Sequence, residues 1–199
     1  MSVTEPGRRE RTKAANRAAI LEAARATFGE IGYGAASVRD IVRATDLAAG
    51  TFYNYFPDKE AVFLALVEEI AAEARARVRA ARRNAVSPAA FVTEGFRAYF
   101  AFIVEDPANQ AFLSRNAGTI RGLLEDGPMS LGAGELQEDI ESAGAAPGLD
   151  SNYMAHAMVA IGLELGARLL ERDPPDVEGA TAFASGLVLG GLERLSRPA

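Results

Sequence analysis

The chain has 199 residues, of which 49% are hydrophobic and 24% are charged, the proportions of a globular protein. It contains no cysteine and a single histidine, which excludes a disulfide framework and a zinc finger. The polar start lacks the apolar core of a signal peptide. The longest uncharged apolar run, residues 179–192, is too short to cross a bilayer of about 30 Å. We therefore expect a cytoplasmic protein with no membrane partner.

The net charge of -6 is unevenly distributed along the chain. Residues 1–60 hold nine Lys and Arg against eight Asp and Glu, a net +1, whereas the remainder is acidic, with 12 against 19. Local charge governs contact with phosphate, so only the first part suits a nucleic acid. Residues 1–12 are expected to form a basic arm carrying Arg8, Arg9 and Arg11. That arm is either a solvated tail or a segment that follows DNA.

Three helices are predicted in the first sixty residues. Apolar residues recur at helical spacing from Lys13 to Gly32 and predict a long first helix. Residues 37–47 predict a helix of about two turns, because Ser37 is a good N-cap and Asp40 lies three residues later. A turn follows, and another short helix begins near Ala49. This arrangement is a helix-turn-helix, which places its second helix in the DNA major groove.

The second short helix carries residue types that a plain connection does not need. Gly50 lets the backbone approach a phosphate closely, and Thr51 offers a hydroxyl to a phosphate or a base edge. Tyr53 can meet a thymine methyl or a phosphate, and Asn54 can read an adenine. Tyr55 and Lys59 are expected to bind phosphate. The alternative for the two tyrosines is that they fill the core.

Residues 37–60, with the long helices on either side, resemble the DNA-binding domain of the TetR family of bacterial transcriptional regulators. The string Gly50-Thr51-Phe52-Tyr53-x-Tyr55-Phe56-x-x-Lys59 is the signature of that family. The resemblance covers roughly residues 12–64, and beyond it only the helical layout is similar. It implies DNA contacts at Ser37, Arg39, Gly50, Thr51, Tyr53, Tyr55 and Lys59. Because Ala48 and Ala49 offer little for base reading, Arg39 is the best candidate for a guanine contact.

A long helix is predicted over residues 61–85, with its first turn in the DNA-binding part and its far end in the rest of the protein. Near that far end lies an arginine cluster at positions 75, 77, 79, 82 and 83, which we interpret as a solvated face. Gly127 and Pro128, followed by Gly132 and Gly134, predict a loop.

Five of the ten phenylalanines fall between Phe91 and Phe112. So much aromatic surface is either core or the wall of a cavity for an apolar ligand. The family resemblance implies an inducer pocket in the C-terminal domain, with the helix after Ser87 as one wall. The candidate ligand-binding residues are Phe96, Tyr99, Phe100, Phe112, Asn116 and Met158.

The last two helices, predicted over residues 150–172 and 177–194, are apolar on two sides. Ala182, Gly186 and Gly190 permit close helix approach. The resemblance implies a homodimer in which these helices form a four-helix interface with those of a second copy. His156 is interpreted as a surface or hydrogen-bonded residue.

The sequence thus predicts an all-α protein of about nine helices. Residues 1–60 form an N-terminal arm and helix-turn-helix DNA-binding domain, and residues 61–199 form a helical ligand-binding and dimerisation domain. The expected function is that of a homodimeric transcriptional regulator that binds double-stranded DNA with an inverted-repeat operator. Repression relieved by a small apolar or aromatic effector is the family default, and activation remains an alternative.

The sequence disfavours two other classes of function. An enzyme is disfavoured because no nucleophile elbow, P-loop, metal-ligand spacing or paired-carboxylate motif is visible. No catalytic residue, metal or cofactor is therefore expected. A helical ligand-binding or chaperone-like protein without DNA binding is disfavoured by the intact set Thr51, Tyr53, Tyr55 and Lys59.

Overall fold

The computed structural model describes residues 7–125, 128–144 and 148–196. This part of the chain holds ten helices and no strand, which confirms the predicted all-α class. The expected number of helices was about nine. Residues 107–125 form two helices, α6 (Pro107–Arg115) and α7 (Ala117–Glu125), with Asn116 between them.

The first three helices are α1 (Arg8–Ala35), α2 (Val38–Arg43) and α3 (Ala49–Tyr53). Helix α1 starts earlier than predicted, so Arg8, Arg9 and Arg11 belong to its first turns rather than to an arm. Glu10 lies in the first turn, where its negative charge interacts favourably with the positive end of the helix dipole. The regular helix is interrupted at Gly32, where φ is 81°, a value that glycine adopts without strain. Residues 1–6, the rest of the predicted arm, lie outside the described residues.

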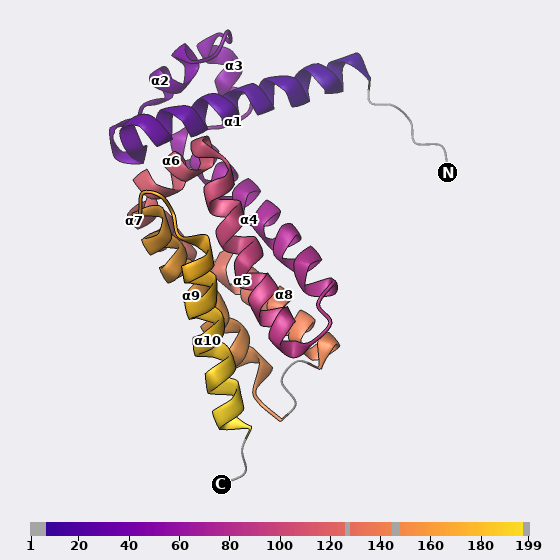
Figure 1. Ribbon diagram of the computed structural model, residues 1–199. Helices are drawn as coiled ribbons and strands as arrows, with labels where there is room; N and C mark the ends of the chain where they lie inside the picture. The colour runs from indigo at the N-terminus through magenta and orange to yellow at the C-terminus, as the bar shows by residue number, and fades with distance from the viewer. Residues whose placement is uncertain (1–6, 126–127, 145–147, 197–199) are drawn as a thin grey trace.

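Helix α4 (Lys59–Arg83) begins at the cap provided by Asp58, whose side chain accepts from the Ala61 backbone N–H at 2.8 Å. Helix α5 (Pro88–Glu105) begins in the same way at Ser87 and has proline at its first position. Both starts depend on local chemistry alone, since each has a side-chain cap directly before the helix. Helix α4 leads from α1–α3 along the whole bundle, with α5 beside it (Figure 1).

The remaining helices are α8 (Pro128–Ala143), α9 (Ser151–Leu170) and α10 (Val177–Leu195). The loop predicted around Gly132 and Gly134 is wrong, since both glycines lie inside α8. Helix α8 packs on α9 and α4 and buries Ala133, Leu136 and Ile140. That burial outweighs the helix-breaking tendency of the glycines. Asp126 and Gly127 are not among the described residues.

Helices α1–α3 lie across one end of the bundle that α4, α5, α8, α9 and α10 form (Figure 1). We call residues 7–58 the head and residues 59–196 the body. Helix α1 packs on α6 and α4, so the two parts share one continuous core. Among the described residues, α9 is the one helix long and apolar enough by composition to cross a membrane. Core helices have the same character, and α9 packs against α5, α8 and α10.

Candidate DNA-binding surface and ligand cavity

Ser37 and Asp40 fix the start of α2. The backbone N–H of Asp40 donates to Ser37 Oγ at 3.3 Å, and the backbone N–H of Ser37 donates to Asp40 Oδ2 at 2.9 Å. This reciprocal capping box satisfies two free donors at the helix start. The hydrogen bonds from Ser37 lower the pKa of the Asp40 carboxyl. Ser37 is therefore engaged in folding, although its side chain remains at the surface.

The outer face of α2 and α3 is exposed and largely without internal partners. Arg39 is exposed and makes no hydrogen bond or ion pair with the described residues. Tyr53 has 57% of its surface exposed and therefore does not fill the core. Phe52 is fully buried and meets the Tyr53 ring edge-on at 5.4 Å between centroids. One side chain thus anchors α3 and its neighbour points into solvent.

Gly50, Thr51 and Asn54 lie on the same short helix or at its end. Gly50 and Asn54 are exposed, and Thr51 is half-buried. A Cβ built on Gly50 meets nothing within 4 Å, so the glycine is not required by packing inside the head. The open space in front of it is available to a close-lying partner.

Lys59 is engaged inside the protein, which the sequence did not indicate. Its Nζ donates to the carbonyl oxygens of Tyr33 at 2.7 Å and Ala36 at 2.9 Å, and lies 4.4 Å from the centroid of the Tyr33 ring. The lysine thereby joins the start of α4 to the end of α1. An ammonium has three N–H donors, so one remains for a phosphate. Tyr55 is half-buried and packs on the core.

The first turns of α1 lie beside the end of α3. One open hollow brings together side chains from these two places, namely Arg8, Arg9, Glu10, Thr12, Lys13, Asn54 and Tyr55. Three cations of α1 therefore continue the exposed face of α3 along one side of the head. A polyanion that contacts α3 would meet them next.

Two of the predicted ligand-binding residues, Phe112 and Asn116, lie in the joint between head and body instead of a cavity. The Asn116 amide donates from Nδ2 to the carbonyls of Phe28 and Phe112, and its Oδ1 accepts from the Tyr33 backbone N–H at 2.7 Å. Phe112 is fully buried against Phe28 and Phe63. This corrects the expectation that both face an effector, since their surfaces are already used in packing α6 on α1.

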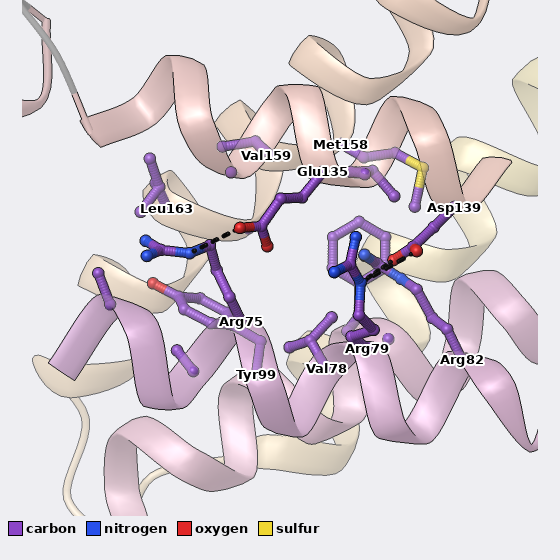
Figure 2. Close-up of a pocket in the computed structure, with 17 residues that line it drawn as sticks. Arg75, Val78, Arg79, Arg82, Tyr99, Glu135, Asp139, Met158, Val159 and Leu163 are labelled. Atoms are coloured by element: carbon purple, nitrogen blue, oxygen red, sulfur yellow. Dashed lines mark hydrogen bonds and ion pairs between the residues drawn. The ribbon is translucent and has the colours of Figure 1, made fainter. Parts of the chain in front are cut away.

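A cavity of about 160 Å³, partly open to solvent, lies in the body between α4, α5, α8 and α9 (Figure 2). Phe96, Tyr99 and Met158 line it, and their contact with a ligand stays a prediction. Burial raises the pKa of Tyr99 to about 12, so its hydroxyl stays protonated. Phe100 does not line the cavity, because it is fully buried and stacks on Phe96 at 5.9 Å between centroids.

Three members of the arginine cluster line this same cavity, where a solvated face was expected. Arg75, Arg79 and Arg82 share one side of α4 with the apolar stripe that packs on the bundle. Arg75 pairs with Glu135 of α8 at 3.6 Å, and Arg79 pairs with Asp139 at 3.1 Å (Figure 2). Arg75 and Arg82 follow Ala71 and Val78 of the same cavity wall by four residues each, and this helical spacing indicates the side of α4 that they share but not their partners on α8.

The outer edge of α10 is apolar and uncovered. Phe183 and Leu187 are 63% and 55% exposed, and a Cβ on Gly186 or Gly190 meets nothing within 4 Å. The same helix buries Thr181, Ala184 and Ser185 against the bundle. On α9, His156 is exposed and its Nδ1 lies 2.9 Å from the Asn152 carbonyl oxygen, as expected for a surface residue.

A helix-turn-helix with an outward-facing second helix is the arrangement found in a class of DNA-binding proteins, and here it is joined to a helical bundle that has a pocket. The model of the family described as "Bacterial regulatory proteins, tetR family" matches residues 20–66. Residues 20–66 are therefore similar to the DNA-binding part of TetR-family regulators. The match ends in the first part of α4, and the head is the part of the chain that carries it.

Similar proteins agree with this assignment. The HTH-type transcriptional repressor AcnR from Corynebacterium efficiens is 47% identical over 57 residues, which are 29% of this chain and 30% of AcnR. The match thus spans less than a third of the curated relative. A TetR-family transcriptional regulator from Syntrophomonas wolfei has the same fold over 91% of this chain and 96% of its own, with a TM-score of 0.77 and 21% identity. FadR from Bacillus subtilis, in complex with stearoyl-CoA, matches over 87% and 98%, with a TM-score of 0.69 and 20% identity.

Proposed function

We propose that this protein is a cytoplasmic, ligand-responsive transcriptional regulator that binds double-stranded DNA through its head and represses transcription until a small effector fills the cavity of its body. The domains in this proposal are residues 1–60 for DNA binding and residues 61–199 for effector binding and dimerisation. The single observation that carries it is the exposed, unpartnered face of α2 and α3, with Arg39, Gly50 and Tyr53 turned to solvent.

DNA contact would use side chains of the head that are exposed on α2 and α3. The Arg39 guanidinium suits a guanine edge, and the Tyr53 phenol suits a thymine methyl or a phosphate. Ser37, Thr51, Asn54 and Tyr55 are proposed to supply further contacts from the same face. Lys59 would add its remaining N–H to a phosphate while holding α1 and α4 together. Backbone atoms of Gly50 would approach the phosphates most closely.

The proposed functional unit is a homodimer. The apolar edge of α10, with Phe183 and Leu187 exposed and open space over Gly186 and Gly190, suits a second copy of the same helix. A two-fold symmetric pair presents two heads, which requires inverted half-sites about a helical turn or more apart. A monomeric protein would leave this apolar edge in water.

Effector binding is proposed for the cavity between α4 and α9, with Phe96, Tyr99 and Met158 in contact with the ligand. The cavity touches α4, and the first turns of α4 hold the end of α1 through Lys59. A ligand that prefers one placement of α4 would therefore change the spacing of the two heads. The FadR complex shows that this fold accommodates a ligand in another protein.

An enzymatic function is not proposed, because the similar proteins named above are described as regulators. A ligand-binding protein without DNA binding is disfavoured by the exposure of Tyr53 and Arg39, which a purely structural head would not need.

The test begins with selection of duplexes from a random library by the purified full-length protein. Recovery of an inverted repeat is the expected result. Affinity for that duplex is then measured by fluorescence anisotropy across salt concentrations for Arg39→Ala and for the control Arg83→Ala, an exposed arginine at the far end of α4. Arg39→Ala should weaken binding by roughly ten- to hundredfold and relax the preference at one base pair. Failure to enrich any duplex, or equal affinities of the two variants, would refute the proposal.

A further inference from the structure

The charged groups on the cavity wall are not all paired. Three arginines and two carboxylates line the cavity, and two further carboxylates pair with the arginines from outside the lining. Two of the arginines each have two acidic partners, Arg75 with Glu68 and Glu135, and Arg79 with Glu138 and Asp139. Arg82 makes no ion pair with any described residue, although the negative charge of Asp139 lies near enough to raise the pKa of Arg82 slightly against the effect of burial. Figure 2 shows it extending into the cavity beside the Arg79–Asp139 pair.

The Arg82 guanidinium packs against the protein but lacks a hydrogen-bond acceptor for its Nε–H. Its Nε is enclosed by protein atoms and has no hydrogen-bond partner. Its central carbon lies 5.3 Å from the centroid of the Phe91 ring, which supports the cation from one side. A Cβ on Gly95 would lie only 2.6 Å from Nε, so this glycine inside α5 makes room for the arginine. Burial lowers the pKa of Arg82 to about 10, which leaves it protonated at neutral pH.

Removing a cation from water costs free energy unless a partner accepts hydrogen bonds from its N–H groups and balances its charge. The protein supplies that partner for Arg75 and Arg79 but not for Arg82. A guanidinium presents its N–H groups in a planar fork that matches the two oxygens of a carboxylate. Arg82 is the one arginine of the described cavity lining that makes no ion pair, so a ligand with one negative charge matches it. A dianion such as a phosphate monoester would bring a second negative charge that no unpaired cation of this lining meets.

The rest of the cavity sets the size and polarity of the ligand. Beyond the charged groups, its wall is made by Ala71, Ala74, Val78, Phe96, Leu136, Met158, Val159 and Leu163. A volume of about 160 Å³ is close to that of cavities of about 150 Å³ that hold benzene. The ligand therefore has on the order of ten non-hydrogen atoms, most of them apolar.

We propose that the effector is a small aromatic or short-chain aliphatic monocarboxylic acid, bound as its anion by Arg82 with its apolar part between α5 and α9. This inference rests on the regulatory function proposed above and names the chemical class of its ligand. In this proposal Arg82 pairs with the carboxylate, and Gly95 leaves space for the Arg82 side chain. The apolar wall disfavours anions that lack a hydrophobic part.

The test compares acids with neutral molecules of the same shape. Isothermal titration calorimetry of the full-length protein at neutral pH uses benzoate, phenylacetate, hexanoate and octanoate, each beside its primary amide. At least one acid should bind roughly tenfold or more tightly than its amide, because only the acid pairs with the guanidinium. Acetate, which carries the charge without the apolar part, should bind more weakly than hexanoate.

Two variants locate the effect. Arg82→Met keeps an unbranched side chain but removes the charge, and Arg83→Met does the same at the neighbouring exposed position. The preference for acid over amide should fall to roughly twofold or less in Arg82→Met and stay unchanged in Arg83→Met. Arg82→Met should also melt at or above the wild-type temperature without ligand, since it loses an unpaired buried cation. A merely structural arginine would instead lower the melting temperature when replaced.

Three results would overturn the ligand class: equal affinities of acids and amides, no binding of any acid in the series, or the same loss in both variants. DNA binding to the selected duplex, measured in parallel without ligand, separates these from failure of the proposed function. A protein that binds duplex but does not prefer acids remains a regulator with another effector. One that prefers acids but binds no duplex has the cavity chemistry without the regulatory role.

Discussion

The head and the cavity of the body treat their charged side chains in opposite ways. In the head, Arg39 projects into water with no internal partner, which costs little because water solvates it. In the cavity, Arg75 and Arg79 each have carboxylates from two directions, because an enclosed charge without a partner is expensive. An unpaired charge on an open surface is therefore ordinary, whereas the unpaired Arg82 inside the body is informative.

The largest effect we expect comes from breaking the joint between the two regions. Phe112→Ala removes a fully buried ring from the cluster with Phe28 and Phe63 and should lower the free energy of unfolding by about 3–5 kcal/mol. Hydrogen exchange should become faster in both α1 and α6, because Phe112 belongs to α6 and its ring packs on Phe28 of α1. Urea unfolding followed by circular dichroism gives the total loss.

Phe112→Leu is the matched control, since it keeps most of the apolar volume and should cost less than about 1.5 kcal/mol. If the head behaved as an independent unit, exchange in α1 would stay at the wild-type rate in Phe112→Ala while α6 opened. That outcome would contradict the single continuous core and with it the route by which the body influences the head.

A smaller effect, confined to binding, is expected at Gly50. Gly50→Ala adds a methyl group that meets nothing in the free protein and improves helix propensity, so stability should hold or rise by up to about 1 kcal/mol. If the α3 backbone lies against phosphates, the same methyl should weaken duplex binding roughly tenfold, about 1.4 kcal/mol. Anisotropy on the selected duplex measures this directly. Gly118→Ala, at an equally open glycine of α7, should change stability in the same direction but leave duplex affinity unchanged.

Much of the head was predictable from sequence because its structure is local. The Ser37 cap, the turn and the short helix at Ala49 each follow from neighbouring residues, and the outward position of Tyr53 follows from the burial of Phe52 beside it. The internal use of Lys59 was not predictable. Its acceptors, Tyr33 and Ala36, come from the end of another helix whose direction the sequence does not state.

The cavity was predictable only in part because it depends on how distant helices meet. Phe96 and Met158 were identified as ligand-facing from aromatic and apolar content, but Asn116 was assigned to the ligand when its amide in fact joins α6 to α1. The inward-facing arginines were read as solvated, since their partners on α8 lie about sixty residues away, as in the bond from Arg79 to Asp139. Long-range pairing of this kind leaves no mark near either residue.

The smallest effect we expect concerns the cap of α2 and depends on pH. Hydrogen bonds from Ser37 lower the pKa of Asp40 in the folded protein relative to the unfolded chain. The ionised carboxylate therefore stabilises the fold at pH values above its unfolded pKa of about 3.9, and this contribution is lost as the pH falls through the lower folded pKa. The stability difference between wild type and Asp40→Asn should be largest near neutral pH and shrink below about pH 4.

Urea unfolding at several pH values measures this difference, and the Ser37→Ala background supplies the control. Without the Ser37 hydroxyl the carboxylate loses a main hydrogen-bond partner, so Asp40→Asn should then have a smaller and flatter effect across pH. A difference that stays constant from neutral pH to pH 3 would show that Asp40 acts through something other than its charge. Because Asp40 is not among the proposed DNA contacts, the effect of Asp40→Asn on duplex affinity at neutral pH should be small beside that of Arg39→Ala. Asp40 would then serve the folding of the head, whereas Ser37 would serve both the cap and the proposed contact with DNA.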